Sequence, residues 1–322
     1  MKPHPSDLSS LPPVVAVVGP TAVGKSSFAL DVALRFGGEV ISCDSMQVYR
    51  GLDIGTDKLP PARWRGVPHH LLDLAEPGTY FSAGAFRRAA LEVLGDLGRR
   101  GRNAVLVGGT GLYYRSLVSG LVEAPSRDEA LRARLFEKIL VKGPERLHRV
   151  LSRLDPLYAP TVRPNDALRI VRALEVRILS GVPLGERIRE NPIGSGSLPR
   201  VLKIGLTAPR RLLYDSIESR VEAMVAAGWL DEVAHLKERG VLGGPVAKAI
   251  GYGELGCVLD GTLTLEGAVE RIKTRSRNLA KRQWTWFRKD ADVAWYDVTQ
   301  EAWHDRTFRC IETWIQTAPR QP

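Results

Sequence analysis

The first hydrophobic pattern in the chain is an unbroken run, Val14–Val18. A run of β-branched residues without polar alternation is typical of a central strand in a parallel sheet, which is buried on both faces. A glycine-rich turn follows, and residues 26–36 then show helical spacing, with apolar side chains at Ala29, Val32, Ala33 and Phe36. The pattern therefore predicts a buried strand, a turn and a helix with one apolar face.

The same order of elements repeats further along the chain. A second apolar run predicts a strand at Val40–Cys43, and a helical pattern over Ala83–Arg100 leads into a third strand at Ala104–Val107. The strand pattern resumes at Val201–Leu206, and Trp295–Val298 is a candidate last strand. Strands that alternate with helices form a parallel sheet covered by helices. The predicted fold class is therefore α/β, a parallel sheet flanked by helices.

A long segment in the middle of the chain lacks strand patterns. Residues 127–189 show only helical spacing and contain 14 Lys or Arg against 8 Asp or Glu. A loop rich in glycine and proline, Asn191–Pro199, follows this segment. We therefore expect a flexible tail at residues 1–13, a core built from residues 14–122 and 200–322, and an all-helical insertion at residues 123–199.

Charge and cysteine content narrow the class of protein. The 322 residues include 46 Lys or Arg against 36 Asp or Glu, a net charge of +10. This excess indicates a polyanionic partner or, alternatively, a generally basic surface. Cys43, Cys257 and Cys310 are widely spaced, which argues against a disulfide framework or a zinc knuckle and favours a reducing compartment. With no apolar segment long enough for a signal or a membrane span, we expect a soluble cytoplasmic protein.

The turn after the first strand carries a phosphate-binding pattern, G-x-x-x-x-G-K-[ST]. Its residues are Gly19, Pro20, Thr21, Ala22, Val23, Gly24, Lys25 and Ser26. In such a P-loop, backbone N–H groups surround a phosphate chain, the helix N-terminus adds partial positive charge, and the lysine reaches the outer phosphate. The Ser26 hydroxyl is a candidate Mg²⁺ ligand. The alternative is a glycine turn that merely joins strand to helix.

Asp44 stands directly after the second predicted strand. Parallel sheets place functional residues at the carboxyl ends of their strands, so this carboxylate is expected beside the P-loop. It can hold Mg²⁺ or accept a proton from an acceptor substrate, whereas an Asp that caps a turn is the structural alternative. From these residues alone, nucleotide hydrolysis, phosphoryl transfer to a small acceptor and displacement of diphosphate from another ligand all stay open.

Further motifs carry a resemblance to a known family. They are SCDSMQVY at 42–49, DIGT at 53–56, VPHHLLD at 67–73, GGTGLYY at 108–114, RALE at 172–175, AIGY at 249–252 and AKRQWTWFR at 280–288. Together with the P-loop, and in this order, they resemble the bacterial tRNA dimethylallyltransferases, over about residues 14–289. The resemblance implies transfer of a dimethylallyl group from dimethylallyl diphosphate to the exocyclic amine of the adenosine 3′ to a tRNA anticodon. The P-loop would then hold the diphosphate leaving group.

The resemblance also implies roles for individual residues. Asp44 matches the general base on the amine, Thr110 joins it in the catalytic set, and Arg220 matches an arginine that neutralises the departing diphosphate. Contacts to tRNA are implied for Asp44, Ser45, Met46, Gln47, Thr110 and Arg132. In the helical insertion, Arg169 and Arg172 are the preferred tRNA contacts, with pairing to Glu175 as the alternative.

A second basic segment, residues 271–289, holds eight Lys or Arg and no acid. Lys281 and Arg282 are candidate contacts to phosphates of the anticodon stem. The alternative assigns the interleaved aromatic side chains to a core and the charges to solvent. His69 and His70 could form an acid/base pair, but adjacent histidines without a metal partner are more often structural.

The expected partners are a tRNA anticodon stem-loop and dimethylallyl diphosphate, with Mg²⁺ as the cofactor, and neither a membrane nor a protein partner is implied. Three rival functions stay open: a small-molecule P-loop kinase, an enzyme that prenylates free adenine nucleotides, and a tRNA-binding module that uses a nucleotide as a switch.

Overall fold

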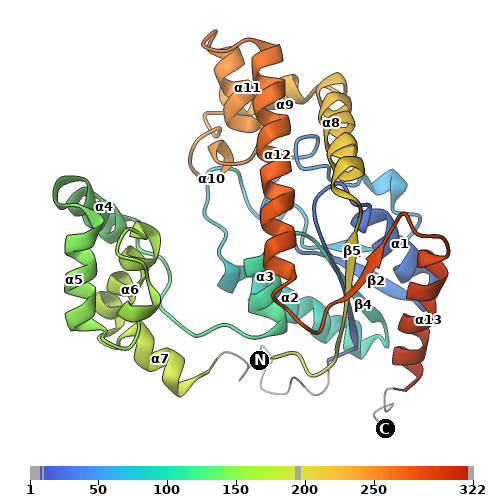
Figure 1. Cartoon of the computed structure of the whole chain (residues 1–322), viewed down its shortest axis with the longest axis horizontal. Helices are drawn as coiled ribbons and strands as arrows, with labels where there is room; N and C mark the ends of the chain where they lie inside the picture. Colours follow the sequence, from blue (N-terminus) through green and yellow to red (C-terminus); the bar gives the residue numbers. More distant parts are fainter. Residues whose placement is uncertain (1–7, 9–10, 193–196, 318–322) are drawn as a thin grey trace. The chain divides into compact units, whose positions relative to one another are not determined.

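The computed structural model describes residue 8 and residues 11–192 and 197–317. The chain divides into two units, one made of residues 1–118 and 198–322 and the other of residues 119–197. Figure 1 shows the order of the elements along the chain. The sequence-based boundaries of the insertion, 123 and 199, lie close to those of the second unit.

The first unit is built on a six-stranded sheet in which every pair of neighbouring strands is parallel. The strand order is β3-β2-β4-β1-β5-β6. The bounds are β1 Val14–Val18, β2 Gly38–Ser42, β3 His69–His70, β4 Asn103–Val107, β5 Val201–Thr207 and β6 Ala294–Asp297. The predicted fold class is thus confirmed. The two-residue edge strand β3 was not predicted, because it is too short to show a periodic pattern.

The unbroken apolar run of β1 has a direct structural cause. Val14, Ala16 and Val18 contribute to one hydrophobic core, whereas Val15 and Val17 contribute to a second core on the opposite face of the sheet. All five residues are at most 2% exposed. Because successive side chains of a strand point to opposite faces, a strand covered on both sides needs apolar residues at every position.

Helices cover both faces of the sheet (Figure 1). The core that contains Val15 also receives α1 (Lys25–Phe36) and α13 (Trp303–Gln316), where the Phe28 and Phe308 rings lie 5.6 Å apart. The opposite core receives α2 (Ala83–Arg99) and α3 (Gly111–Val118). The other α-helices described in this unit are α8 Arg210–Ala226, α9 Trp229–Glu238, α10 Gly244–Ala247, α11 Tyr252–Leu259 and α12 Leu265–Phe287.

This arrangement defines where a ligand can bind. The helix α1 follows β1 and packs on one face, whereas α3 follows the neighbouring strand β4 and packs on the other. In open α/β sheets, the crevice outside the carboxyl ends of two such strands is the usual ligand site. The loops after β1, β4 and β2 meet at this edge, and they carry the P-loop, Thr110 and Asp44.

The second unit is helical, and a core of its own holds it together. It contains α4 Glu129–Lys142, α5 Pro144–Leu154, α6 Ala167–Ser180 and α7 Leu184–Glu190. Leu151 and Ile170 are fully buried between these helices. The buried Asp155 accepts N–H bonds from Tyr158 at 3.1 Å and from Gly185 at 2.9 Å, so its charge is not left without partners. In neither unit does the described part of the chain contain a helix long and apolar enough to cross a membrane.

Candidate active site

The P-loop has the backbone geometry that its sequence predicts. Gly19 has φ of 141°, and a Cβ there would lie 2.4 Å from the carbonyl oxygen of Leu206 in the adjacent strand β5. Gly24 has φ of 89° and immediately precedes α1. Ala22 also has positive φ, 65°, a strained conformation for a residue with a side chain. Such strain is concentrated at functional sites, where it fixes the direction of backbone N–H groups.

Lys25 lies folded over this loop. Its Nζ donates to the carbonyl oxygen of Pro20 at 2.7 Å. Burial and the positive charge of Arg220 lower the pKa of Lys25 to about 7, against the opposing effects of Asp44 and Asp57. A further negative group bound at the loop would stabilise the charged ammonium, because opposite charges favour each other's ionised forms. The site therefore favours an anion such as a phosphate chain.

The loops after β2 and β4 are bonded to each other. Thr110 Oγ1 accepts the N–H of Ser45 at 3.0 Å, and its hydroxyl donates to Ser45 Oγ at 3.3 Å. The N–H of Thr110 donates to the carbonyl oxygen of Cys43 at 3.3 Å. Gly108 permits this approach, since a Cβ there would lie 2.1 Å from the same carbonyl oxygen. Thr110 thus fixes the backbone on which Asp44 stands.

The carboxylate of Asp44 is held at one oxygen only. Its Oδ1 accepts the N–H of Met46 at 2.8 Å and that of Gln47 at 3.4 Å, whereas Oδ2 has no hydrogen-bond partner among the residues described. The neighbouring Cys43 is an unsuitable nucleophile, because burial and the Asp44 charge raise the pKa of its thiol well above the usual value. Asp44 is the group in this loop that can accept a proton.

Arg220 approaches the P-loop from α8. Its guanidinium donates to Thr21 Oγ1 at 2.6 Å and to Asp57 Oδ2 at 3.2 Å. The two contacts fix an arginine beside the loop that also contains Lys25. The structure therefore brings together three of the predicted site features, namely the P-loop, the Asp44–Thr110 pair and Arg220.

Gln283 is a site residue that the sequence did not single out. It is 9% exposed, and its Oε1 accepts the N–H of Thr21 in the P-loop at 2.7 Å. Its Nε2 donates to the carbonyl oxygen of Gly109 at 3.1 Å. One amide from α12 therefore joins the loop after β1 to the loop after β4. Asp57, the partner of Arg220, was missed as well. The sequence signals were the place of Gln283 inside the 280–288 motif and the place of Asp57 directly after the 53–56 motif.

The basic residues of α12 fall into two groups. Lys273 pairs with Glu222 at 2.7 Å, while Arg275 and Arg277 contact Glu254 and Glu218. Lys281 and Arg282 are exposed and form no ion pair within the described ranges. Two aromatic side chains of this segment pack into the core, as the alternative interpretation expected, whereas contact of Lys281 and Arg282 with tRNA stays a prediction. Phe287 is fully buried, and Trp286 packs against Gly111.

In the helical unit, Glu175 pairs with two of the arginines that the sequence predicts to contact tRNA. It is fully buried and accepts from Arg132 at 3.1 Å and from Arg172 at 2.9 Å. The Arg132 side chain is 11% exposed and that of Arg172 is 34% exposed. Arg169 is more open, at 63%, and pairs with Asp166 at 3.4 Å.

His69 and His70 occupy structural positions at the sheet edge. Nδ1 of His69 lies 2.9 Å from the carbonyl oxygen of Val67, and its ring stacks on Trp64. Nε2 of His70 lies 2.7 Å from a carboxylate oxygen of the buried Glu39. The His70 ring thus joins β3 to Glu39 of β2, whereas the His69 ring contacts the segment that precedes β3.

The residues present fit a Mg²⁺ ion that is shared with a phosphate ligand. Within the described residues no cluster of three or more His, Cys, Asp or Glu could enclose a metal. Mg²⁺ usually takes one or two protein oxygens and completes its shell with water and substrate phosphates. The exposed hydroxyl of Ser26, in the first turn of α1, is an oxygen of this kind.

Comparisons with known proteins identify the family of the chain. The model of the family described as IPP transferase matches residues 47–290, and that of isopentenyl transferase matches residues 12–75. A tRNA dimethylallyltransferase of Symbiobacterium thermophilum is 48% identical over 89% of this chain and 90% of its own. The crystal structure of the tRNA isopentenylpyrophosphate transferase of Bacillus halodurans is 40% identical, with a TM-score of 0.68 over 94% of this chain and 97% of its own. A eukaryotic dimethylallyltransferase described as acting on tRNA is 29% identical, with a TM-score of 0.82 over 96% and 81%.

Proposed function

Because the chain belongs to the tRNA dimethylallyltransferase family, we propose that it transfers the dimethylallyl group of dimethylallyl diphosphate to the N6 amine of the adenosine next to the anticodon of a tRNA, on its 3′ side. The observation that supports this best is that one sheet edge combines a P-loop, the Asp44 carboxylate and the Arg220 guanidinium. One oxygen of this carboxylate, Oδ2, has no hydrogen-bond partner among the described residues. A phosphate-binding loop alone does not require Asp44, whereas transfer to an amine needs a proton acceptor.

Asp44 is proposed as the general base. An adenine amine is a weak nucleophile, and a carboxylate within hydrogen-bond reach accepts its proton as the new C–N bond forms. Oδ1 is held by the loop, which leaves Oδ2 to receive the proton. Thr110 is proposed to keep this loop in place through its bonds to Ser45.

The P-loop is proposed to bind the diphosphate and to stabilise it as it leaves. Negative charge develops on the leaving group, and fixed donors that point at this charge lower the barrier. Lys25, the backbone amides and Arg220 are such donors. A Mg²⁺ ion held by Ser26 would supply further charge neutralisation when bound.

The helical insertion, residues 123–199, is proposed to bind tRNA together with exposed residues of α12. Phosphate contacts supply affinity, and solvent-exposed cations are suited to them. Arg169, Lys281 and Arg282 have such exposed charges. Arg132 and Arg172 belong to the proposed set as weaker members, because Glu175 holds both. Ser45, Met46 and Gln47 complete the proposed set of tRNA contacts, beside the adenine. This base must leave the stacked anticodon loop to reach Asp44.

The test is transfer of label. The purified protein is incubated with radiolabelled dimethylallyl diphosphate, Mg²⁺ and a tRNA that has adenosine 3′ to the anticodon, with parallel reactions that contain ATP or AMP as the acceptor. We expect label in the tRNA and none in the nucleotides. Label in AMP or ATP supports the free-nucleotide prenyltransferase, and ATP turnover without label supports the kinase. Either result contradicts the proposed function.

A further inference from the structure

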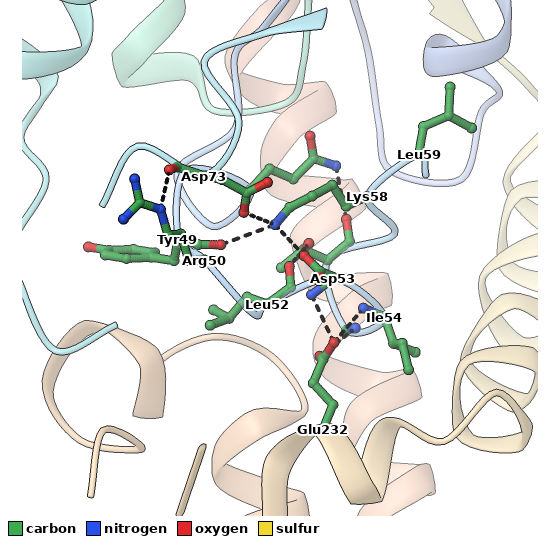
Figure 2. A network of polar contacts seen from close by, with 12 residues as sticks. Tyr49, Arg50, Leu52, Asp53, Ile54, Lys58, Leu59, Asp73 and Glu232 are labelled. Carbon is green, nitrogen blue, oxygen red and sulfur yellow. Dashed lines mark hydrogen bonds and ion pairs between the residues drawn. The ribbon is translucent and has the colours of Figure 1, made fainter. Parts of the chain in front are cut away.

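The loop after β2 has an unusual anchor. Its turn at residues 53–58 is neither helix nor strand, so the N–H groups at its start, those of Asp53, Ile54 and Gly55, need partners from outside the turn. Glu232 of α9 supplies them: Oε2 accepts the N–H of Asp53 at 2.8 Å and of Ile54 at 2.7 Å, and Oε1 accepts that of Gly55 at 3.1 Å. Figure 2 shows the Glu232 side chain reaching up from its helix to the turn.

The same carboxylate has a fourth donor. The hydroxyl of Tyr252 donates to Oε1 at 2.7 Å, so each oxygen of Glu232 accepts two bonds. Hydrogen bonds to an ionised acceptor are shorter and stronger than those between neutral groups. Trp229 from the same helix packs directly on the turn, since a Cβ at Gly55 would lie 2.1 Å from its Nε1. Glu232 and Trp229 thus both contact this end of the turn.

The other end of the turn is held by Lys58. Its Nζ donates to Asp53 at 2.5 Å, to Asp73 at 2.8 Å and to the carbonyl oxygen of Tyr49 at 3.1 Å, as the dashed lines of Figure 2 show. Its side chain is only 6% exposed. With both ends fixed, Thr56 and Asp57 between them have a defined position.

These two residues reach the active site. The carbonyl oxygen of Thr56 accepts Nε2 of Gln47 at 3.0 Å, three positions after Asp44. Asp57 pairs with Arg220 at 3.2 Å. Arg220 in turn donates to Thr21 of the P-loop at 2.6 Å. A continuous chain of bonds therefore runs from Glu232 through the turn to the phosphate-binding loop.

We propose that Glu232 is a positioning residue for the transfer reaction, which sets the 53–57 turn so that Asp57 holds Arg220 in the place where it meets the diphosphate. This inference rests on the proposed function. Glu232 itself touches no reacting group, and its effect passes through Asp57. If Glu232 served stability alone, its effect on the reaction would not pass through the contact between Asp57 and Arg220.

The test is a double-mutant cycle with Glu232→Gln and Asp57→Asn. The glutamine keeps the size of Glu232, but its NH₂ group replaces an oxygen that accepts two donors. We expect Glu232→Gln to lower kcat/KM for dimethylallyl diphosphate by about tenfold, since small misplacements of catalytic groups have effects of this order or larger. The tRNA dissociation constant should stay within about twofold. Glu238→Gln, an exposed position of the same helix, is the matched control and should leave kcat/KM unchanged.

The way the two substitutions combine in the double variant decides whether Glu232 positions Arg220 or only stabilises the fold. If Glu232 acts through Asp57, its substitution in the Asp57→Asn background lowers kcat/KM by less than about twofold, because the ion pair with Arg220 that it sets is already lost. Losses that multiply in the double variant would overturn the proposal, as would an unchanged kcat/KM in folded Glu232→Gln. If Glu232→Gln does not fold, Tyr252→Phe, which removes one donor from Glu232, takes its place in the cycle. Wild-type protein that transfers no label contradicts the proposed function, whereas multiplying losses in an active wild type contradict only the positioning role.

Discussion

Gln283 offers a direct test of how the active-site loops are joined. Replacing it with leucine preserves its approximate volume, but leaves the N–H of Thr21 and the carbonyl oxygen of Gly109 without their present partner. A buried group without a partner costs about 1–3 kcal/mol. Thr21 is only half-buried, and water can satisfy part of the loss, so about 2 kcal/mol is a reasonable total. If this cost falls on the catalytic arrangement of the P-loop, kcat/KM for dimethylallyl diphosphate falls about 30-fold.

The assay is steady-state prenyl transfer, together with calorimetric binding of inorganic diphosphate. Thr285→Ala is the control, because Thr285 is exposed on the same helix and its hydroxyl bonds, among the described residues, only to the carbonyl oxygen of Lys281. We expect Gln283→Leu to weaken diphosphate binding and to lower kcat/KM, while the control matches the wild type. Tighter diphosphate binding in Gln283→Leu would refute the reasoning, because it would mean that Gln283 occupies an N–H that the phosphate needs.

Three further predictions concern the fold and the charge. The side chains of Arg100 and His70 hold the pKa of Glu39 at about 2, below the unfolded value of 4.5, so this carboxylate stabilises the fold above pH 4.5 and its contribution is lost as the pH falls towards 2. Glu39→Gln should flatten the decrease of the urea midpoint over that interval, and an unchanged pH profile would argue against the effect. Gly55→Ala places a Cβ against Trp229 and should destabilise the protein by about 1–3 kcal/mol in urea titrations, whereas a wild-type midpoint would mean that the turn yields freely. The tRNA dissociation constant should depend steeply on salt, because many phosphates are contacted, and that of the diphosphate only weakly; equal slopes would contradict the assignment of the basic surface.

The main elements of the fold could be predicted because their signals are local. Val14–Val18 is apolar at every position since both faces of β1 are buried, and the glycines of the P-loop adopt the positive φ that their spacing indicates. The His69–His70 strand could not be predicted, because its two residues join the sheet only through pairing with β2. The family resemblance carried by the motifs is confirmed by the comparisons.

The candidate site was predictable only in part. Asp44 and Thr110 each follow a strand, and the topology of a parallel sheet brings such positions together. The partnerships of Gln283 with Thr21, and of Arg220 with Asp57, join residues 262 and 163 positions apart, and no local pattern encodes them. They arise from the packing of α8 and α12 against the sheet edge. In the insertion, the alternative pairing with Glu175 is present for Arg172, and the same carboxylate also holds Arg132.

The central claim is that Asp44 accepts the proton of the amine in a transfer from diphosphate to tRNA. The most direct measurement is the single-turnover rate of label transfer by Asp44→Asn at saturating tRNA, with the tRNA dissociation constant measured separately. Asparagine can still accept the N–H bonds of Met46 and Gln47 through its carbonyl oxygen, but it is not a base. We predict tRNA binding close to that of the wild type and a rate about 100- to 10,000-fold lower, the usual range for a lost general base. Weakened tRNA binding with an unchanged single-turnover rate would contradict the account and assign Asp44 a structural role.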